Sequence, residues 1–386
     1  MKILLYDMGA FTQNDIMSVL DKMGIAYENV LYKLKDVQAD PYFEKRIKEI
    51  LKKSSFNAVF SVNFFPVLAR ICNEASIKYI AWSYDSPLNE KDLEETIGLS
   101  CNYVFLFDRE ECRKWNRKGY GNVYHLPLAV NAERLDNLQL TEEDIRKYSC
   151  DVSMVGQLYE SVLPDLLQFC DAYDRGYISA LIETQLKLYG SYLFDELITD
   201  FVTNRINEAF NRIPGNLLHL ETDALCVHMA KEVTNLERSL LLEEMALGNK
   251  LHLYSSNKGG LSENICWKGS AGYFDEMPKV FKLSKINLNI SLKCIQSGIP
   301  LRALDILASG GFLLSNYQPE LAEYFTDGED LVLYYSMEDA LQKCEYYLKH
   351  EDERKAIAAN GREKAKAFFS YEKKLQEMFT TAGFQL

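Results

Sequence analysis

Residues 2–34, KILLYDMGAFTQNDIMSVLDKMGIAYENVLYKL, contain the pattern from which the fold class follows. The short apolar run at 2–7 ends just before Gly9, as a buried β-strand followed by a turn does. Apolar residues recur every three to four positions over 14–23, which predicts a helix. A second apolar run at 27–34 predicts another strand. The stretch is therefore one unit of strand, helix and strand.

The same alternation of strands and helices continues through the first part of the chain. Further strands are predicted at 58–63, 79–84, 104–107 and 122–130, and helices at 41–53 and 66–75. Strands that alternate with helices form a parallel sheet joined by right-handed crossovers. We therefore predict that residues 1–148 form a Rossmann-like domain, with the domain boundary near residue 149.

Three aspartates, Asp7, Asp85 and Asp108, lie at the carboxyl ends of predicted strands. Ligands of a parallel sheet bind beyond the carboxyl ends of its strands, so all three are candidates for a binding site. Aspartate is also common in turns and at helix starts, and this structural role is the alternative for Asp7 and Asp108. Asp85, in the turn of WSYDSP, is the candidate cleft residue. No GxGxxG motif surrounds Gly9, so we expect no dinucleotide site in this half.

The composition excludes one class of partner. The chain has 386 residues, with 43 Lys and Arg against 56 Asp and Glu, which gives a formal net charge of −13. A surface this acidic repels a phosphate backbone, so a nucleic-acid partner is not expected. Hydrophobic residues make up 47% and charged residues 26%, and this balance is typical of a folded globular protein.

Nine cysteines and five histidines are dispersed along the chain, with no CxxC pair and no spacing typical of metal ligands. We expect reduced, packed thiols and no metal site. No stretch has the roughly 20 uncharged apolar residues that a membrane-spanning helix needs. Asp7 comes too early for an N-terminal signal peptide. These features predict a cytoplasmic protein without a transmembrane segment.

A second Rossmann-like domain is predicted over 149–370, with a last helix in 371–386 that packs back on the first domain. Strands at 151–156 and 251–254 bracket about ninety residues without strand signals, which predicts a helical insertion at about 160–248. Glu237 and Arg238 are expected on a solvated face of that insertion. Within it, helices are predicted at 163–174, 178–189, 193–210 and 225–247.

The most informative stretch of the second half is QSGIPLRALDILASGG at 296–311. A loop with Gly298 leads into a helix that can begin at Pro300, where a missing N–H costs least. The free N–H groups of a helix start and the positive end of its dipole form an anion site. Arg302 can hold two phosphate oxygens there, and Asp305 can accept from ribose hydroxyls. A local ion pair between Arg302 and Asp305, three residues apart, is the alternative.

Several longer motifs carry a family resemblance. They are FSVNFFPVLARIC, YIAWSYDSP, FLFDRE and NVYHLPLAV in the first half, and SKINLNIS, SGIPLRALDILASGGFLLSNYQPELAEYF and YYLKHEDERKAIAANGREKAKAFFSYEKKL in the second. The second half resembles the CgeB-type (spore maturation protein) branch of the group 1 glycosyltransferases. The first half is similar to the N-terminal domain that accompanies that branch. The resemblance implies a GT-B architecture, α/β, with two Rossmann-like domains facing a cleft, the donor on the second and the acceptor approaching from the first.

The resemblance also implies roles for single residues. Asp305 occupies the position of the second acidic residue of the family's loop motif, which contacts the ribose. Ser297 stands at the first acidic position, so the carboxylate that touches the sugar is absent. Gln157 replaces the arginine that usually follows Gly156. The donor-binding residues implied in this way are Gly156, Tyr254, Ser255, Gly272, Tyr273, Ser297, Gly298, Ile299, Arg302 and Asp305. Tyr273 would offer the base a stacking surface.

We predict from this a metal-independent hexosyltransferase that moves a sugar from a nucleoside-diphosphate donor, UDP-sugar first, to a glycan or protein acceptor. Arg302 would stabilise the leaving diphosphate, and Asp85 would act on the acceptor hydroxyl. No DxD motif of the metal-dependent type and no further cofactor is expected. Two alternatives stay open: a sugar-nucleotide epimerase or hydrolase on the same fold, and a catalytically silent nucleotide-sugar binding protein.

Overall fold

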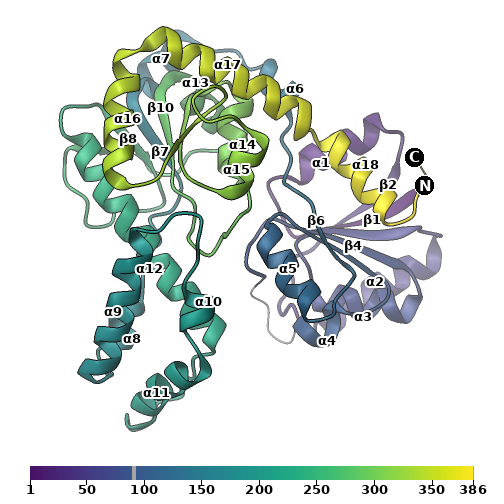
Figure 1. Cartoon of the computed structure of the whole chain (residues 1–386). Coiled ribbons are helices and arrows are strands. Elements are labelled where there is room, and N and C mark those ends of the chain that lie inside the picture. The colour runs from purple at the N-terminus through teal and green to yellow at the C-terminus, as the bar shows by residue number, and fades with distance from the viewer. Residues whose placement is uncertain (89–92, 386) are drawn as a thin grey trace. The chain divides into compact units, whose positions relative to one another are not determined.

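The computed structural model describes residues 1–88 and 93–385, and the chain divides into two compact units (Figure 1). Unit 1 comprises Met1–Asn131 and Lys366–Leu386, and unit 2 comprises Ala132–Ala365. Each unit is built around a six-stranded sheet whose neighbouring strands all pair in parallel. The strands of both sheets are largely buried, as parallel strands covered by helices must be. The predicted α/β class is therefore confirmed.

In unit 1 the strand order is β2-β1-β3-β4-β5-β6. Its strands are β1 (Lys2–Asp7), β2 (Ala26–Leu31), β3 (Ala58–Val62), β4 (Lys78–Ser83), β5 (Asn102–Leu106) and β6 (Val123–His125). Its helices are α1 (Gln13–Lys22), α2 (Pro41–Lys53), α3 (Pro66–Ala75), α4 (Leu93–Ile97), α5 (Arg109–Arg117) and α18 (Tyr371–Thr381). Local chemistry fixes their starts: Asp40, for example, accepts from the N–H of Phe43 and caps α2.

In unit 2 the strand order is β12-β11-β10-β7-β8-β9. Its strands are β7 (Cys150–Val155), β8 (Leu251–Tyr254), β9 (Ile265–Trp267), β10 (Ser284–Asn289), β11 (Leu313–Asn316) and β12 (Val332–Tyr334). Its helices are α6 (Ala132–Asp136), α7 (Glu142–Tyr148), α8 (Leu163–Leu167), α9 (Ala172–Leu186), α10 (Phe194–Leu197), α11 (Asp200–Asn211), α12 (Thr222–Ala246), α13 (Met277–Leu283), α14 (Leu301–Ala308), α15 (Pro319–Tyr324), α16 (Met337–Lys349) and α17 (Glu351–Phe368), which runs into the last segment of the chain.

The strand order of unit 2 has a functional consequence. Read from β9, the strands follow the sequence third, second, first, fourth, fifth and sixth, which is the Rossmann order. The order reverses between β7 and β10, which pair directly. Ligands of such sheets bind beyond the carboxyl ends of the two strands at this switch point. In unit 1 the corresponding switch point lies between β1 and β3.

The boundary between the units falls at residues 131 and 132, whereas we predicted it near 149. Residues 132–148 form α6 and α7, and α7 is tied to unit 2. Lys147 and Tyr148 both donate to Glu276 at 2.8 Å. The last segment belongs to unit 1, where the Tyr371 ring of α18 lies edge-on to Trp82 at 6.0 Å between centroids.

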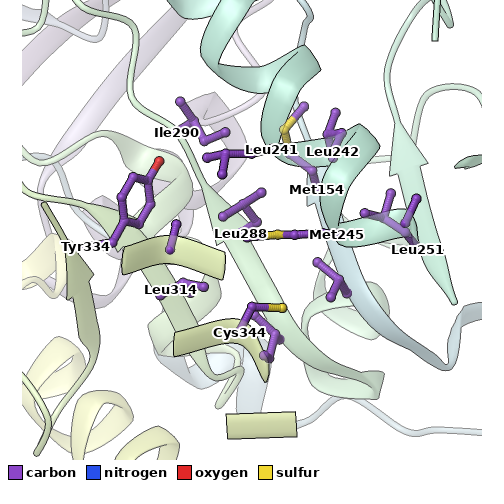
Figure 2. Close-up of a cluster of buried hydrophobic side chains, with 14 of the residues drawn as sticks. Met154, Leu241, Leu242, Met245, Leu251, Leu288, Ile290, Leu314, Tyr334 and Cys344 are labelled. Carbon is purple, nitrogen blue, oxygen red and sulfur yellow. The ribbon is translucent and has the colours of Figure 1, made fainter. Parts of the chain in front are cut away.

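The main core of unit 2 lies between its sheet and the helices α12 and α16. Figure 2 shows Leu241 and Met245 of α12 beside Met154 and Leu288 of the sheet. All four side chains are nearly inaccessible to solvent. The second half of α12 is therefore fixed against the strands that bracket the switch point.

A helical insertion between β7 and β8 carries its own core. Figure 1 shows α8 to α11 extending away from the sheet of unit 2, while α12 leads back to it. We predicted a helical insertion at about 160–248, and α8 to α12 lie between β7 and β8 with bounds that differ from those of the predicted helices. The helix expected at 163–174 is two helices, because Asp171 accepts from the N–H of Asp174 and starts α9 there. The insertion's own core is formed mainly by Ile178, Phe194, Ile206, Phe210, Met229 and Val233.

Candidate functional site

A cavity of about 360 Å³ lies in unit 2 at the carboxyl ends of β7, β8 and β10. Gly156, Tyr254 and Asn289 line it at the ends of these three strands. This is the switch point at which the strand order places a ligand. The volume falls within the range of sites for small molecules, roughly 300–1,000 Å³.

Two arginines give this cavity a positive lining. Arg238 of α12 and Arg302 of α14 both border it. No aspartate or glutamate is among the described residues that line it. The chain as a whole carries a net charge of −13, so the cavity differs in sign from the rest of the protein. An anionic ligand is what such a lining attracts.

The Arg302 guanidinium is held only weakly by the protein. Its Nη1 lies 2.9 Å from the sulfur of Met277 and 3.4 Å from Oδ2 of Asp305. Its Nε is buried without a hydrogen-bond acceptor. The local ion pair that we named as the alternative is therefore present, but it is long and leaves donor capacity at the cavity.

Asp305 and Tyr273 lie together beside the cavity rather than in its lining. The Tyr273 hydroxyl donates to Oδ1 of Asp305 at 3.2 Å, and Arg302 approaches the other carboxylate oxygen. Gly272 donates its N–H to the carboxylate of Glu276 at 3.0 Å. The loop after β9 reaches the cavity with Ser270 and Ala271 instead, directly before the two residues that we predicted.

The loop before α14 contributes differently from the prediction. Ser297, Gly298 and Ile299 are buried and do not line the cavity, whereas Ile295 and Pro300 do. The Ser297 hydroxyl donates to Oε1 of Glu320 at 2.8 Å, and the N–H of Glu320 donates to the Ser297 carbonyl at 3.1 Å. Pro300 is the N-cap residue of α14, and no side chain caps this helix.

Our prediction that Glu237 and Arg238 face solvent is wrong, because both side chains are buried. Oε2 of Glu237 pairs with Nζ of Lys293 at 2.7 Å, and Oε1 accepts from the hydroxyls of Tyr189 and Tyr334 at 2.9 Å each. Arg238 donates to two main-chain carbonyls. These partners replace water for the Glu237 carboxylate and for Nη1 and Nη2 of Arg238, whereas Nε of Arg238 has no acceptor.

Arg238 is the charged residue of the cavity that sequence reasoning missed, although one signal for it existed. It lies four residues after Thr234 and three before Leu241, and both of those are buried. Position 238 therefore falls on the inward face of α12. We gave more weight to its charge than to this spacing.

In unit 1, the exposed Asp85 lies just after the end of β4 and is bound by Asn63, a residue with a left-handed backbone. Nδ2 of Asn63 donates to Oδ2 of Asp85 at 2.7 Å, and the N–H of Tyr84 donates to the Asn63 amide oxygen at 2.8 Å. Asn63 has φ of 65°, a left-handed conformation that L side chains rarely adopt. Such strained positions cluster at functional sites.

The other two aspartates have the turn and capping roles. Asp108 accepts from the N–H of Glu110 at 3.0 Å and caps α5, and Asp7 accepts from the N–H of Gly9 at 2.7 Å. A different acid, Glu111, supports the turn that contains Asp85. Glu111 accepts from the Ser86 hydroxyl and from the N–H of Leu88, both at 2.6 Å. Burial raises the pKa of Glu111 to about 7.

Residues 1–88 and 93–385 bear on three expectations, which concern metals, thiols and membranes. No cluster of three or more His, Cys, Asp or Glu side chains there is arranged to hold a metal ion. No helix there combines the length and the apolar character needed to cross a membrane. All nine cysteines are free, and Cys266 is the exposed one.

Residues 238–380 match a protein family described as "Glycosyl transferase-like". No curated protein matches the chain in sequence. The matched segment contains both arginines of the cavity, Arg238 and Arg302.

Solved structures match over nearly the whole chain. A glycosyltransferase from Rickettsia africae is 12% identical with a TM-score of 0.53, covering 98% of this chain and 97% of that one. Sucrose-phosphate synthase from Thermosynechococcus elongatus is 9% identical with a TM-score of 0.59, covering 99% and 98%. Anabaena HepE in complex with UDP-glucose is 10% identical with a TM-score of 0.56, covering 99% of each chain. The two parallel six-stranded sheets and this likeness confirm the predicted α/β fold of the GT-B glycosyltransferases.

Proposed function

We propose that the protein transfers a sugar from a nucleoside-diphosphate donor to an acceptor hydroxyl, as group 1 glycosyltransferases of the CgeB type do. One observation carries this proposal. The cavity at the switch point of unit 2 is lined by Gly156, Tyr254, Ser255 and Arg302, four residues that we had assigned to the donor from the sequence. The family match over residues 238–380 supports the same chemistry.

Arg302 has a defined task in this reaction. The bond between the anomeric carbon and the diphosphate oxygen breaks, and the negative charge of the leaving diphosphate grows. A guanidinium with donor capacity, in a cavity that no described Asp or Glu side chain lines, stabilises that charge. The uncapped start of α14 adds the positive end of a helix dipole. Because side chains and the helix can take up this charge, we propose that transfer needs no metal ion.

The donor is proposed to be a UDP-hexose. Support comes from the similar fold of Anabaena HepE, whose structures hold UDP-glucose, or UDP and glucose. Tyr273 and Asp305 are our candidates for the base and the ribose. For that role Asp305 must exchange its contacts with Tyr273 and Arg302 for hydroxyls of the ligand.

The acceptor is proposed to be a glycan or a protein. As the acceptor oxygen forms its bond to the anomeric carbon, Asp85 takes the proton from the hydroxyl. Its carboxylate is exposed and oriented by Asn63, which are the properties a general base needs. The protein is proposed to lie in the cytoplasm. Its nine free cysteines support this location, because the cytoplasm is a reducing compartment.

The first test is thermal unfolding with uridine, guanosine and thymidine diphosphates. A ligand that binds only the folded state raises the melting temperature. We expect the largest rise with UDP. A melting temperature that none of the three nucleotides changes would contradict a nucleotide-diphosphate site in this cavity.

A panel of sugar nucleotides then separates transfer from the alternatives. Release of nucleoside diphosphate that depends on an added acceptor is the expected result. Isomerisation without acceptor would identify an epimerase, and release of diphosphate without acceptor a hydrolase. Thermal stabilisation without any turnover, across donors and acceptors, would identify a binding protein.

A further inference from the structure

The side chain of Arg238 is the most unusual feature of the cavity. It is only 8% exposed, although it is a charged residue on a helix of the insertion. Its Nη1 donates to the carbonyl of Gln157 and its Nη2 to the carbonyl of Ile290. The ring of Tyr159 lies 4.8 Å from its Cζ. Its Nε is buried without an acceptor.

The two carbonyls fix the guanidinium at the switch point. Gln157 follows the end of β7, and Ile290 follows the end of β10. The guanidinium therefore bridges the two strands between which the sheet reverses its order. Gly156 lies against it, since a Cβ at that position would be 3.4 Å from Nη1. The cation is thus held at the place where a parallel sheet receives its ligand.

The charge of Arg238 has no carboxylate partner among the described residues. Its neighbour in sequence, Glu237, is paired with Lys293 instead. Burial lowers the pKa of the Arg238 guanidinium, and the charge of Arg302 acts in the same direction. A guanidinium stays charged in proteins, so the cost of burying it persists until an anion compensates it. Arg302 borders the same cavity and also has an Nε without acceptor.

We propose that Arg238 is a second cationic ligand of the donor's diphosphate, so that α12 of the helical insertion forms part of the donor site. This inference rests on the proposed function. Arg238 and Arg302 share the charge of the diphosphate before and during cleavage of the bond to the anomeric carbon. The insertion is then a necessary part of donor binding and not only an appended domain.

The test compares a diphosphate ligand with one that lacks phosphate. Affinities of the full-length protein for UDP and for uridine are measured by calorimetry with wild type, Arg238→Met and Arg238→Lys. We expect Arg238→Met to weaken UDP binding about 10- to 100-fold, the range for hydrogen bonds to a charged group, and to leave uridine affinity unchanged. Arg238→Lys keeps the charge but loses the fork of N–H groups, so an intermediate loss is expected.

Arg354→Met is the matched control. Arg354 is also a buried arginine of unit 2 that donates to a main-chain carbonyl, that of Tyr347, but it does not line the cavity. This variant should keep the UDP affinity of the wild type. If Arg238→Met does not fold, the lysine variant carries the test, and its UDP affinity must fall while its uridine affinity does not.

The possible failures are distinguishable. A wild-type protein that binds no nucleotide overturns the proposed function itself. A second outcome overturns this inference alone. In it the wild type binds UDP, the Arg238 variants bind UDP as tightly, and Arg302→Met does not. Equal losses of UDP and uridine affinity in the Arg238 variants overturn it as well, because they indicate a general distortion of the cavity.

Discussion

Each of the two units has a switch point at which the order of its parallel strands reverses, but the side chains at the two switch points differ in charge. In unit 2 the strand order reverses between β7 and β10, and a cavity lined by Arg238 and Arg302 lies at that point. In unit 1 the order reverses between β1 and β3. There Asp7 is the last residue of β1, while Asn63, which follows β3, binds Asp85. One unit therefore presents cations at its switch point, and the other presents carboxylates and amides.

The arginines at the switch point of unit 2 and the aspartates of unit 1 also differ in their hydrogen-bond partners. Arg238 and Arg302 of unit 2 each keep an Nε–H group without an acceptor beside a cavity of about 360 Å³. In unit 1, Asp7 and Asp108 are bonded within their own turns, to the N–H groups of Gly9 and Glu110. Topology alone predicts where a ligand can bind. Unmatched buried donors indicate which of two such places is built to hold an anion.

The sharpest way to break the comparison is Asp85→Asn. If unit 1 supplies the base and unit 2 holds the donor, turnover should fall by about 10²- to 10⁴-fold, the usual contribution of a general base. The rise of the melting temperature with UDP should stay that of the wild type. Asp108→Asn is the control, because asparagine caps a helix as well as aspartate does. Normal turnover of the Asp85 variant would exclude the role.

A pH titration of stability tests the environment of Glu111 in unit 1. Its pKa is raised to about 7 by burial, from 4.5, so between these values the folded protein binds a proton that the unfolded chain has lost. This group's contribution to stability is complete below pH 4.5 and declines as the pH rises to 7, by on the order of 3 kcal/mol in total. Glu111→Gln should remove that decline from the free energy of unfolding, measured by urea denaturation from pH 4.5 to 8.

Unit 2 gives a titration of the opposite sign, which sharpens the contrast. Burial lowers the pKa of His252 to about 4, so the folded protein keeps this imidazole neutral while the unfolded chain takes up a proton below 6.5. Stability from this group is lost as the pH falls from 6.5 to 4. The effect of Glu111→Gln must therefore be read as the difference between variant and wild type at each pH. Parallel pH curves for the two proteins would contradict the environment described for Glu111.

Arg302→Met addresses the cation side of the comparison. We expect UDP affinity to fall about 10- to 100-fold, since charge-assisted hydrogen bonds to the diphosphate are lost. Uridine affinity should not change. The measurement is calorimetry at two salt concentrations, because a lost ion contact also weakens the salt dependence of binding. An unchanged UDP affinity would contradict our proposal that Arg302 binds the diphosphate of the donor.

The smallest expected effect concerns the left-handed residue of unit 1. Asn63→Gly removes the side chain that binds Asp85 and Tyr84 but suits the φ of 65°, and Asn63→Ala removes the same bonds at a φ that alanine disfavours. The free energy of unfolding of Asn63→Ala should therefore be about 1 kcal/mol smaller than that of Asn63→Gly, measured by chemical denaturation. Turnover should fall in both variants. Wild-type turnover in the glycine variant would show that Asp85 needs no support from Asn63.

Much of the fold was predictable because its signals are local. The helix Pro41–Lys53 was predicted with its observed bounds, since Asp40 and Pro41 mark its start. The strand Leu251–Tyr254 was predicted equally well. The helix expected at 163–174 was not, because its apolar spacing continues across the break at Asp171. Spacing alone does not distinguish one continuous helix from two consecutive helices.

The site was harder to predict because its contacts are distant in sequence. Arg238 is buried by the carbonyls of Gln157 and Ile290, which lie 81 and 52 residues away. A pattern that extends over four or five residues contains no information about such partners. Arg302 was accessible to sequence reasoning because a loop, a helix start and a charge occur together within a few positions. The contacts between Asp305 and Tyr273, 32 residues apart, again needed the structure.

The chain order of the two units has a consequence for biosynthesis. Unit 2 is inserted between Asn131 and Lys366 of unit 1. Tyr371, Leu375 and Phe379 of α18 are almost fully buried in unit 1 and are translated after all of unit 2. On the ribosome the first sheet emerges early, but the helix that covers part of it follows more than 230 residues later. The nascent protein therefore completes its second unit before its first, the reverse of the usual order of domain folding during synthesis.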